Sequence, residues 1–164
     1  MKIAIISDTH NNTNNLQKAL AIIHRENIDT LIHCGDLTDL EMLSWFGGLR
    51  VNYVFGNGDY LTGAIRQELL RQNPASTAGM VFEGLIDGFR IAAAHGHTFG
   101  TVENLAASQG FDYLFCGHTH HRRDEWLGKT RIINPGSLGG VSRSGPSFCL
   151  LDCSASDLQF ILLE

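Results

Sequence analysis

The residues of this chain that suit chemistry best are acids, amides and histidines at short, regular spacing. They form one Asp-x-His pair, two His-x-His pairs and two residues that each follow a glycine: Asp8, His10, Asp36, Asn57, His95, His97, His118 and His120. Carboxylate, amide and imidazole ligands together suit hard or borderline divalent ions such as Mn, Fe or Zn. The pattern therefore predicts a divalent-metal site.

These residues also share a position relative to the predicted strands. Each motif directly follows a short apolar run typical of a buried strand, and the runs are 2–7, 30–34, 51–55, 90–94 and 112–116. Ligands gather at the carboxyl ends of strands in an open α/β sheet. The glycines before Asp36, Asn57 and His118 are expected to let the backbone turn sharply there.

Each motif alone has a structural explanation. Asp36 or Asp39 could cap a helix over 39–47, Asn57 could be a turn residue, and a single Asp-x-His or His-x-His pair is more often structural. We favour the joint site because five strand ends in one chain carry such residues.

The other histidines and the cysteines are expected to be structural. His24 is expected on a solvated helix face, His33 in the core, and His121 pointing away from the site. No CxxC motif occurs, so buried free thiols in a reducing cytoplasm are expected for Cys34, Cys116, Cys149 and Cys153.

The candidate ligands outnumber those that one ion needs. There are seven of them: Asp8, His10, Asp36, Asn57, His95, His118 and His120. Two ions that share a carboxylate would use the whole set, and Asp36, central in strand order, is the expected bridge. Paired ions clamp the attacking and leaving oxygens of a phosphoryl displacement and acidify a bridging water.

The elements that position these residues change in character along the chain. In the first half, helical patterns over 13–26, 39–47 and 62–72 alternate with strands, which predicts a parallel sheet with crossover helices. Thr13 or a neighbouring asparagine is expected to cap the first helix. The second half predicts a hairpin at Asp87-Gly88 and a helix over 101–109. It also predicts mostly antiparallel strands, over 122–127, 130–134, 147–153 and 158–164.

Length and composition place limits on the protein. A chain of 164 residues predicts a single domain over 1–164, and 43% hydrophobic with 18% charged residues is ordinary for a soluble protein. No apolar run reaches the roughly 18 residues of a membrane span. The start of the chain is interpreted as a strand rather than a signal peptide. The net charge of −5 argues against a nucleic-acid partner.

One group of basic residues allows two interpretations. It could neutralise a substrate phosphate or be a solvated face, and it comprises Arg122, Arg123, Lys129, Arg131 and Arg143.

The motifs resemble a known family when they are taken together. "SDTH" (7–10), "GDLTD" (35–39), "GNGD" (56–59), "HGH" (95–97) and "GHTH" (117–120) resemble the calcineurin-like metallophosphoesterase superfamily. "NPGS" (134–137) and the small size resemble its small bacterial and archaeal phosphodiesterase branch, to which the retromer scaffold subunit is structurally related. The resemblance implies an α/β fold of two packed, mixed β-sheets flanked by helices, in four α-β-β-α layers.

The resemblance also implies how the ligands are divided and what they do. One ion would be held by Asp8, His10, Asp36 and His120, and the other by Asp36, Asn57, His95 and His118. Manganese is the favoured ion, with nickel, iron, zinc or magnesium as alternatives. A metal-bridging hydroxide would attack phosphorus in line with the leaving oxygen.

The sequence departs from the family pattern at Gly58. Many members have a histidine there that acts as a general acid or stabilises the transition state, although the small phosphodiesterases commonly lack it. A general acid typically raises the reaction rate by about 10²–10⁴-fold. Without that histidine, diesters with good leaving groups are expected to be preferred over alkyl monoesters. Gly58 is expected to leave space over the site, with Asn11 and Gly58 facing the substrate. His97 is the nearest alternative acid, or else a partner that orients a ligand.

Three functions follow from this reading. The expected one is a cytoplasmic phosphodiesterase that acts on a small or nucleotide-like phosphodiester and contacts no membrane, with monomer and homo-oligomer both left open. The alternatives are a non-catalytic scaffold of the retromer-subunit type and a nuclease. The complete set of ligands favours the enzyme over a scaffold, and the lack of a basic, aromatic-rich stripe argues against the nuclease.

Overall fold

The computed structural model describes residues 1–141 and 144–164, which contain two β-sheets. The strands of the first sheet are β1 Lys2–Ile6, β2 Thr30–His33, β3 Arg50–Val54, β4 Thr77–Gly79, β10 Ser147–Asp152 and β11 Asp157–Leu162. Their order across the sheet is β11-β10-β1-β2-β3-β4. Strands β1 to β4 run parallel, as predicted, while β10 pairs antiparallel to β1 and the edge strand β11 pairs antiparallel to β10.

The second sheet is built from the middle of the chain. Its strands are β5 Val81–Ile86, β6 Phe89–Ala94, β7 Tyr113–Cys116, β8 Arg122–Leu127 and β9 Thr130–Pro135. The order is β5-β6-β7-β9-β8, and the hairpin β5–β6 turns at Asp87-Gly88 as predicted, with positive φ at both residues.

The prediction that this half is mostly antiparallel is wrong for its central strands. Strands β6, β7 and β9 are parallel, and only the edge strands β5 and β8 run antiparallel to their neighbours. The reason is topological. A crossover helix separates β6 from β7, and β8 returns the chain so that β9 enters the sheet in the direction of β7.

Four helical segments accompany the sheets: α1 Thr13–Arg25, η1 Leu40–Phe46, α2 Thr62–Gln72 and α3 Thr101–Ala107. Helix α1 is capped by Asn12, whose side chain accepts a hydrogen bond from the Asn15 backbone. The helix predicted over 39–47 is a 3₁₀ helix instead, and Asp39 rather than Asp36 caps it. At seven residues it is longer than most 3₁₀ helices, which seldom exceed three or four residues.

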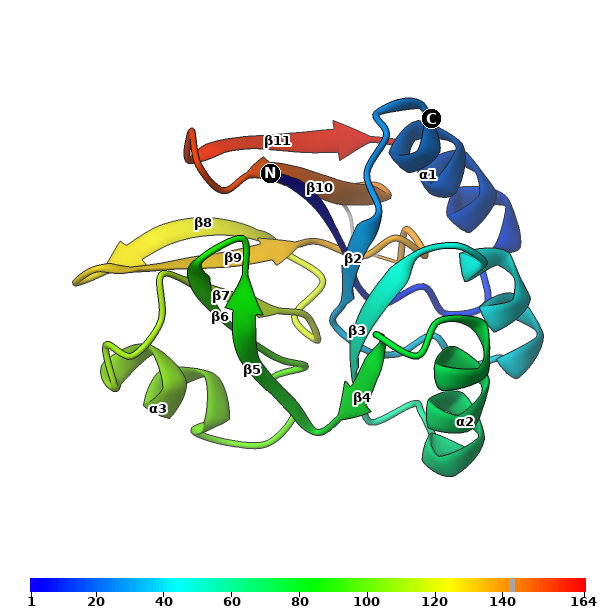
Figure 1. The fold of residues 1–164 in the computed structure, drawn as a ribbon, viewed down its shortest axis with the longest axis horizontal. Coiled ribbons are helices and arrows are strands. Elements are labelled where there is room, and N and C mark those ends of the chain that lie inside the picture. The colour runs from blue at the N-terminus through cyan, green and yellow to red at the C-terminus, as the bar shows by residue number, and fades with distance from the viewer. Residues whose placement is uncertain (142–143) are drawn as a thin grey trace.

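The layers are held together by three separate groups of buried side chains. Along β1, Ile3 and Ile5 face the second sheet, whereas Ala4 and Ile6 face the helices, as the two-residue period of a strand requires. A third group joins α3 to the outer face of the second sheet. Figure 1 shows α1 and α2 on one side of the molecule and α3 on the other. The structure is therefore the predicted four-layer α-β-β-α fold.

This architecture brings the carboxyl ends of strands from both sheets to one place. The segments after β1, β2 and β3 leave the first sheet there, and those after β6 and β7 leave the second. The four cysteines are buried with free thiols, as expected. Among the described residues, none of the helices has the length and apolar character needed to cross a bilayer.

Candidate metal centre

The candidate ligands adopt an uncommon backbone conformation. Five of the seven have left-handed φ angles: Asp8 (53°), His10 (45°), Asp36 (59°), His118 (65°) and His120 (59°). Only a few per cent of non-glycine residues adopt such angles. They cost free energy and persist where the surrounding structure enforces them, often at functional sites. The chain thus turns at the ligands themselves.

Asp8 lies at the centre of the site. Its Oδ1 atom lies 3.1 Å from His120 Nε2, 3.7 Å from His10 Nε2 and 4.0 Å from His95 Nε2. Its Oδ2 atom accepts hydrogen bonds from the Ser7 hydroxyl at 2.5 Å and from the His118 backbone at 3.0 Å. Burial raises the pKa of Asp8, and the Ser7 hydroxyl opposes that rise. The Oδ1 atom is buried and has no hydrogen-bond partner among the described residues.

Asp36 lies between histidines from both sheets. Its Oδ2 atom is 3.6 Å from His95 Nε2 and 4.0 Å from His10 Nε2. Its Oδ1 atom accepts a hydrogen bond from the Gly58 backbone at 2.7 Å. One oxygen of Asp36 is therefore anchored while the other faces two imidazoles.

His95 is oriented by a hydrogen bond behind it. Its Nδ1 atom lies 2.6 Å from the Cys34 carbonyl oxygen, so Nδ1 carries the proton and donates it. Nε2 consequently points toward the carboxylates of Asp8 and Asp36. This Nε2 is also buried without a partner among the described residues.

The donor atoms form two compact groups that suit divalent cations. Asp8, His10 and His120 make one group, and Asp8, Asp36 and His95 make the other, with ligand atoms within 4.8 Å of one another in each. Buried polar atoms without partners are rare in folded proteins. Cations with oxygen and nitrogen ligands would satisfy both orphaned atoms, so the residues present fit a two-metal site.

His118 lies outside these compact groups of carboxylates and imidazoles, and Asn57 is an amide, a ligand type that neither group includes. Asn57 is exposed in the turn after β3, and His118 is exposed with its ring edge-on to His95 at 5.2 Å. Asn57 and His118 border the site from opposite sheets, and their assignment as ligands stays a prediction.

His97 and Asn11, predicted to take part in catalysis and substrate binding, also lie at the site. The ring of His97 is 5.4 Å from that of His95, and its buried Nδ1 has no partner among the described residues. Burial, followed by the neighbouring His95 and His118, lowers the pKa of His97. Asn11 is exposed and accepts a hydrogen bond from the Thr38 hydroxyl at 2.6 Å.

The glycines of the motifs act mainly by leaving room for the carboxylates. Of the three glycines that precede Asp36, Asn57 and His118, only Gly35 has a positive φ, 97°. At Gly56 a Cβ atom would overlap Asp36 Oδ1, and at Gly117 it would overlap the Ser7 hydroxyl. The expected turning role is therefore wrong for Gly56 and Gly117.

The space expected over Gly58 is already filled. A Cβ atom at position 58 would lie 2.9 Å from Thr38 Cγ2 and 3.2 Å from Asp36 Oδ1. Thr38 has φ of 72°, an outlier for a β-branched residue. The Thr38 methyl group thus occupies the volume that a larger side chain at position 58 would need.

Asp59 is the residue that the sequence analysis left without a role. It is buried and accepts five hydrogen bonds of 2.8–3.3 Å, from the backbones of Asp36, Leu37, Thr38 and Gly56 and from the Tyr53 hydroxyl. It therefore ties the segment after β2 to the segment after β3. Its place at the end of the "GNGD" motif was the available signal.

The "NPGS" motif also holds the site in place. The Asn134 amide donates to the Gly117 carbonyl at 2.8 Å and to the Thr119 hydroxyl at 3.1 Å. The Ser137 hydroxyl donates to the Asp8 carbonyl at 3.0 Å. Both residues brace the segments that carry ligands, although neither role was predicted from the motif.

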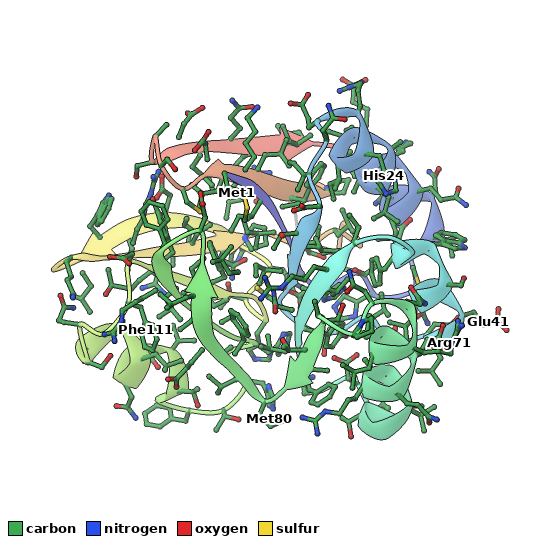
Figure 2. The ribbon with its side chains drawn as sticks, viewed as in Figure 1. Met1, His24, Glu41, Arg71, Met80 and Phe111 are labelled. Carbon is green, nitrogen blue, oxygen red and sulfur yellow. The ribbon has the colours of Figure 1, made fainter. Side chains whose placement is uncertain are left out.

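The remaining histidines are structural, as predicted. His33 is buried, its Nδ1 accepts from the Gly35 backbone and its Nε2 lies 3.1 Å from the Thr9 hydroxyl. Burial lowers the pKa of His33 to about 3, so the ring stays neutral. His24 is exposed on α1 (Figure 2), and His121 is exposed as well.

Parts of the basic group are paired within the protein. Arg131 is largely buried and bonds to Asp124 at 2.7 Å, and Arg123 pairs with Glu125. Arg143 lies outside the described residues. These pairs favour a structural role for Arg123 and Arg131 over phosphate binding.

Comparisons with known proteins agree with this geometry. A family model described as a calcineurin-like phosphoesterase superfamily domain matches residues 1–156. Phosphodiesterase MJ0936 of Methanocaldococcus jannaschii is 32% identical over 166 residues, which cover 100% of both chains. A solved structure of an archaeal phosphodiesterase matches with a TM-score of 0.95 at 32% identity, covering 99% of this chain and 100% of that one. Entamoeba histolytica Vps29 complexed with zinc matches with a TM-score of 0.70 at 27% identity, covering 98% and 90%.

Proposed function

Because this chain belongs to the calcineurin-like phosphoesterase superfamily, we propose that it is a phosphodiesterase with a site for two divalent cations. Its substrate is a small or nucleotide-like phosphodiester. The observation that carries the proposal is the pair of buried, unpartnered atoms Asp8 Oδ1 and His95 Nε2, which face each other across 4.0 Å. A purely structural site would leave neither atom without a partner.

The residues of the site take the roles predicted from the motifs. Asp8, His10, Asp36 and His120 hold one cation, and Asp36, Asn57, His95 and His118 hold the other. Two bound cations neutralise the phosphate and lower the pKa of a coordinated water. Manganese is the proposed ion in both positions, with nickel, iron, zinc or magnesium as alternatives.

The residues around these ligands bind and orient the substrate. The exposed Asn11 amide is placed to donate a hydrogen bond to a phosphate oxygen, since its own oxygen is engaged by Thr38. Asp36 is the proposed bridging carboxylate because its Oδ2 faces histidines of both metal groups. His97 either donates a proton to the leaving oxygen or orients a neighbouring ligand.

An enzyme is favoured over a scaffold by the strain at the site. Five left-handed ligand residues and two unpartnered buried atoms each cost stability. A protein that only binds partners through a distant surface gains nothing from that cost.

The proposal is tested by comparing diester and monoester hydrolysis. Protein stripped of metal and reloaded with manganese is expected to hydrolyse bis-p-nitrophenyl phosphate at least tenfold faster than p-nitrophenyl phosphate, because no histidine stands at position 58. Turnover is measured from p-nitrophenolate absorbance, and the metal-free protein is the control. A preference for the monoester would contradict the diesterase assignment.

The role of Gly58 is tested together with Thr38. Gly58→His alone is expected to slow diester turnover on the order of 10²-fold, because its Cβ displaces Thr38 or Asp36. The double variant Thr38→Gly/Gly58→His removes the tightest contact, with the Thr38 methyl group, and leaves Asp36 Oδ1 at 3.2 Å from the new Cβ atom. It is expected to hydrolyse an alkyl leaving group on the order of 10²-fold faster than Thr38→Gly alone.

The matched control for this experiment is Thr38→Gly/Gly58→Ala, which adds the same Cβ atom at position 58 without a proton donor. If the histidine variant is no faster than the alanine variant on alkyl esters, the leaving-group proton is supplied elsewhere in the site.

A further inference from the structure

A small hollow lies beside the candidate metal centre. It has a volume of about 170 Å³ and lies between the segment after β2 and the start of α2. Most of its lining is apolar and comes from Leu37, Thr38, Leu40, Tyr60, Leu61 and Ile65. We call it the Tyr60 hollow.

The Tyr60 hollow is connected to the metal centre through Thr38. The Thr38 methyl group lies against position 58, and the Gly58 backbone donates to the Asp36 carboxylate. The Thr38 hydroxyl donates to Asn11, the proposed phosphate-binding residue. A group attached to a phosphate at the centre would therefore reach the hollow over Thr38.

The chemistry of the hollow selects a neutral, apolar occupant. Its lining contains no Lys, Arg or His, so a second phosphate finds no counter-charge there. The lining also includes the carboxylates of Asp39 and Asp59, which would repel a second phosphate. Asp39 accepts a hydrogen bond from the Glu41 backbone, and Asp59 accepts five hydrogen bonds.

The rim of the hollow exposes apolar side chains. Tyr60 is 88% exposed and Leu61 is 58% exposed, directly after the buried Asp59. Adjacent exposed apolar side chains beside a polar site are typical of ligand contacts. An exposed tyrosine ring offers a flat face on which another ring stacks.

We infer that the Tyr60 hollow binds a planar ring, either an aryl group or a nucleobase. The ring belongs to the ester substituent that stays on phosphorus after the leaving group departs. This inference rests on the proposed function and names the substrate class of that site. The ring stacks on Tyr60 while the phosphate lies at the metal centre.

A second hollow offers the direct comparison. It has about 180 Å³ and is lined by His95, His97 and Met80, among others. Met80 lies where the chain passes from β4 to β5 (Figure 2). This hollow lacks an aromatic residue other than the two histidines, so it offers no phenyl-type face to a ring.

The test uses three diesters with the same p-nitrophenyl leaving group. The retained group is methyl, phenyl or 5′-thymidyl, and kcat/KM is measured for each with manganese-loaded protein. The ratio of kcat/KM for each ring-bearing diester to kcat/KM for the methyl diester is expected to fall about tenfold in Tyr60→Ala. The same ratio is expected to persist in Tyr60→Phe and in the control Met80→Ala.

The phenyl and thymidyl arms separate the two sources of the ring. A Tyr60-dependent preference for phenyl alone assigns a simple aryl group, and one that includes thymidyl assigns a nucleobase. A ratio that is unchanged in Tyr60→Ala, or that falls in Met80→Ala instead, would overturn the inference.

A binding measurement separates failure of the inference from failure of the proposed function. Calorimetry measures the affinity of the manganese-loaded protein for two compounds, the monomethyl esters of phenylphosphonic acid and of methylphosphonic acid. If no diester is turned over but the phenyl compound binds about tenfold tighter in a Tyr60-dependent way, only the proposed activity fails. Equal binding of both compounds would overturn the ring subsite whether or not the protein is active.

Discussion

Asp36→Asn is expected to reduce diester hydrolysis by about 10³-fold or more while leaving the fold in place. The asparagine oxygen can still accept the hydrogen bond from Gly58, but an NH₂ group replaces the Oδ2 atom that faces His10 and His95. The loss of a shared anionic ligand removes several kcal/mol of charge stabilisation from the two bound cations. A 10³-fold loss of rate corresponds to about 4 kcal/mol in the activation free energy.

The measurement pairs kcat with the manganese content per chain, and Asp29→Asn is the matched control. Asp29 is exposed at the other end of β2, and its side chain accepts a hydrogen bond from the adjacent Thr30 hydroxyl, far from the ligands. If Asp36→Asn keeps both ions and its turnover, Asp36 is not the bridge. Asp8, whose Oδ1 faces His10, His95 and His120, is then the shared carboxylate.

Asp59→Asn is expected to destabilise the protein by about 3 kcal/mol, the largest stability effect at the site. Oδ1 accepts two hydrogen bonds and Oδ2 accepts three, so either orientation of the amide turns its NH₂ group toward backbone donors. Because the same bonds position Asp36, turnover should fall as well. Denaturant unfolding measures the free-energy change.

Two variants calibrate that result. Tyr53→Phe removes only the hydroxyl bonded to Asp59 and Leu37, and we expect a loss of about 1 kcal/mol. Asp157→Asn, an exposed carboxylate on β11, should change stability by less than about 0.5 kcal/mol. An effect of Asp59→Asn no larger than that of Asp157→Asn would show that the two segments are held together by other contacts.

The family, the four-layer fold and the grouping of acids and histidines at strand ends could be predicted from the sequence. The apolar runs of β1, β2 and β7 end within two residues of Asp8, Asp36 and His118, so the change from apolar to polar residues is visible in the sequence itself. The family match and the structural relationship to Vps29, the expected retromer relative, confirm the resemblance.

What escaped prediction depends on contacts between segments far apart in the chain. The Thr38 methyl group fills the space at Gly58, 20 positions away, and no local pattern encodes that approach. Asp59 gains its role only when the segments after β2 and β3 lie side by side. The short β4 and the parallel centre of the second sheet likewise follow from tertiary pairing, which outweighs local propensity.

The most direct test of a two-metal phosphodiesterase is a manganese titration of the metal-stripped protein, with bis-p-nitrophenyl phosphate turnover measured at each step. We expect turnover to be negligible without metal and to reach its maximum at about two equivalents per chain, as the two ligand groups imply. Turnover that is independent of added metal, or that saturates at one equivalent, would contradict the account.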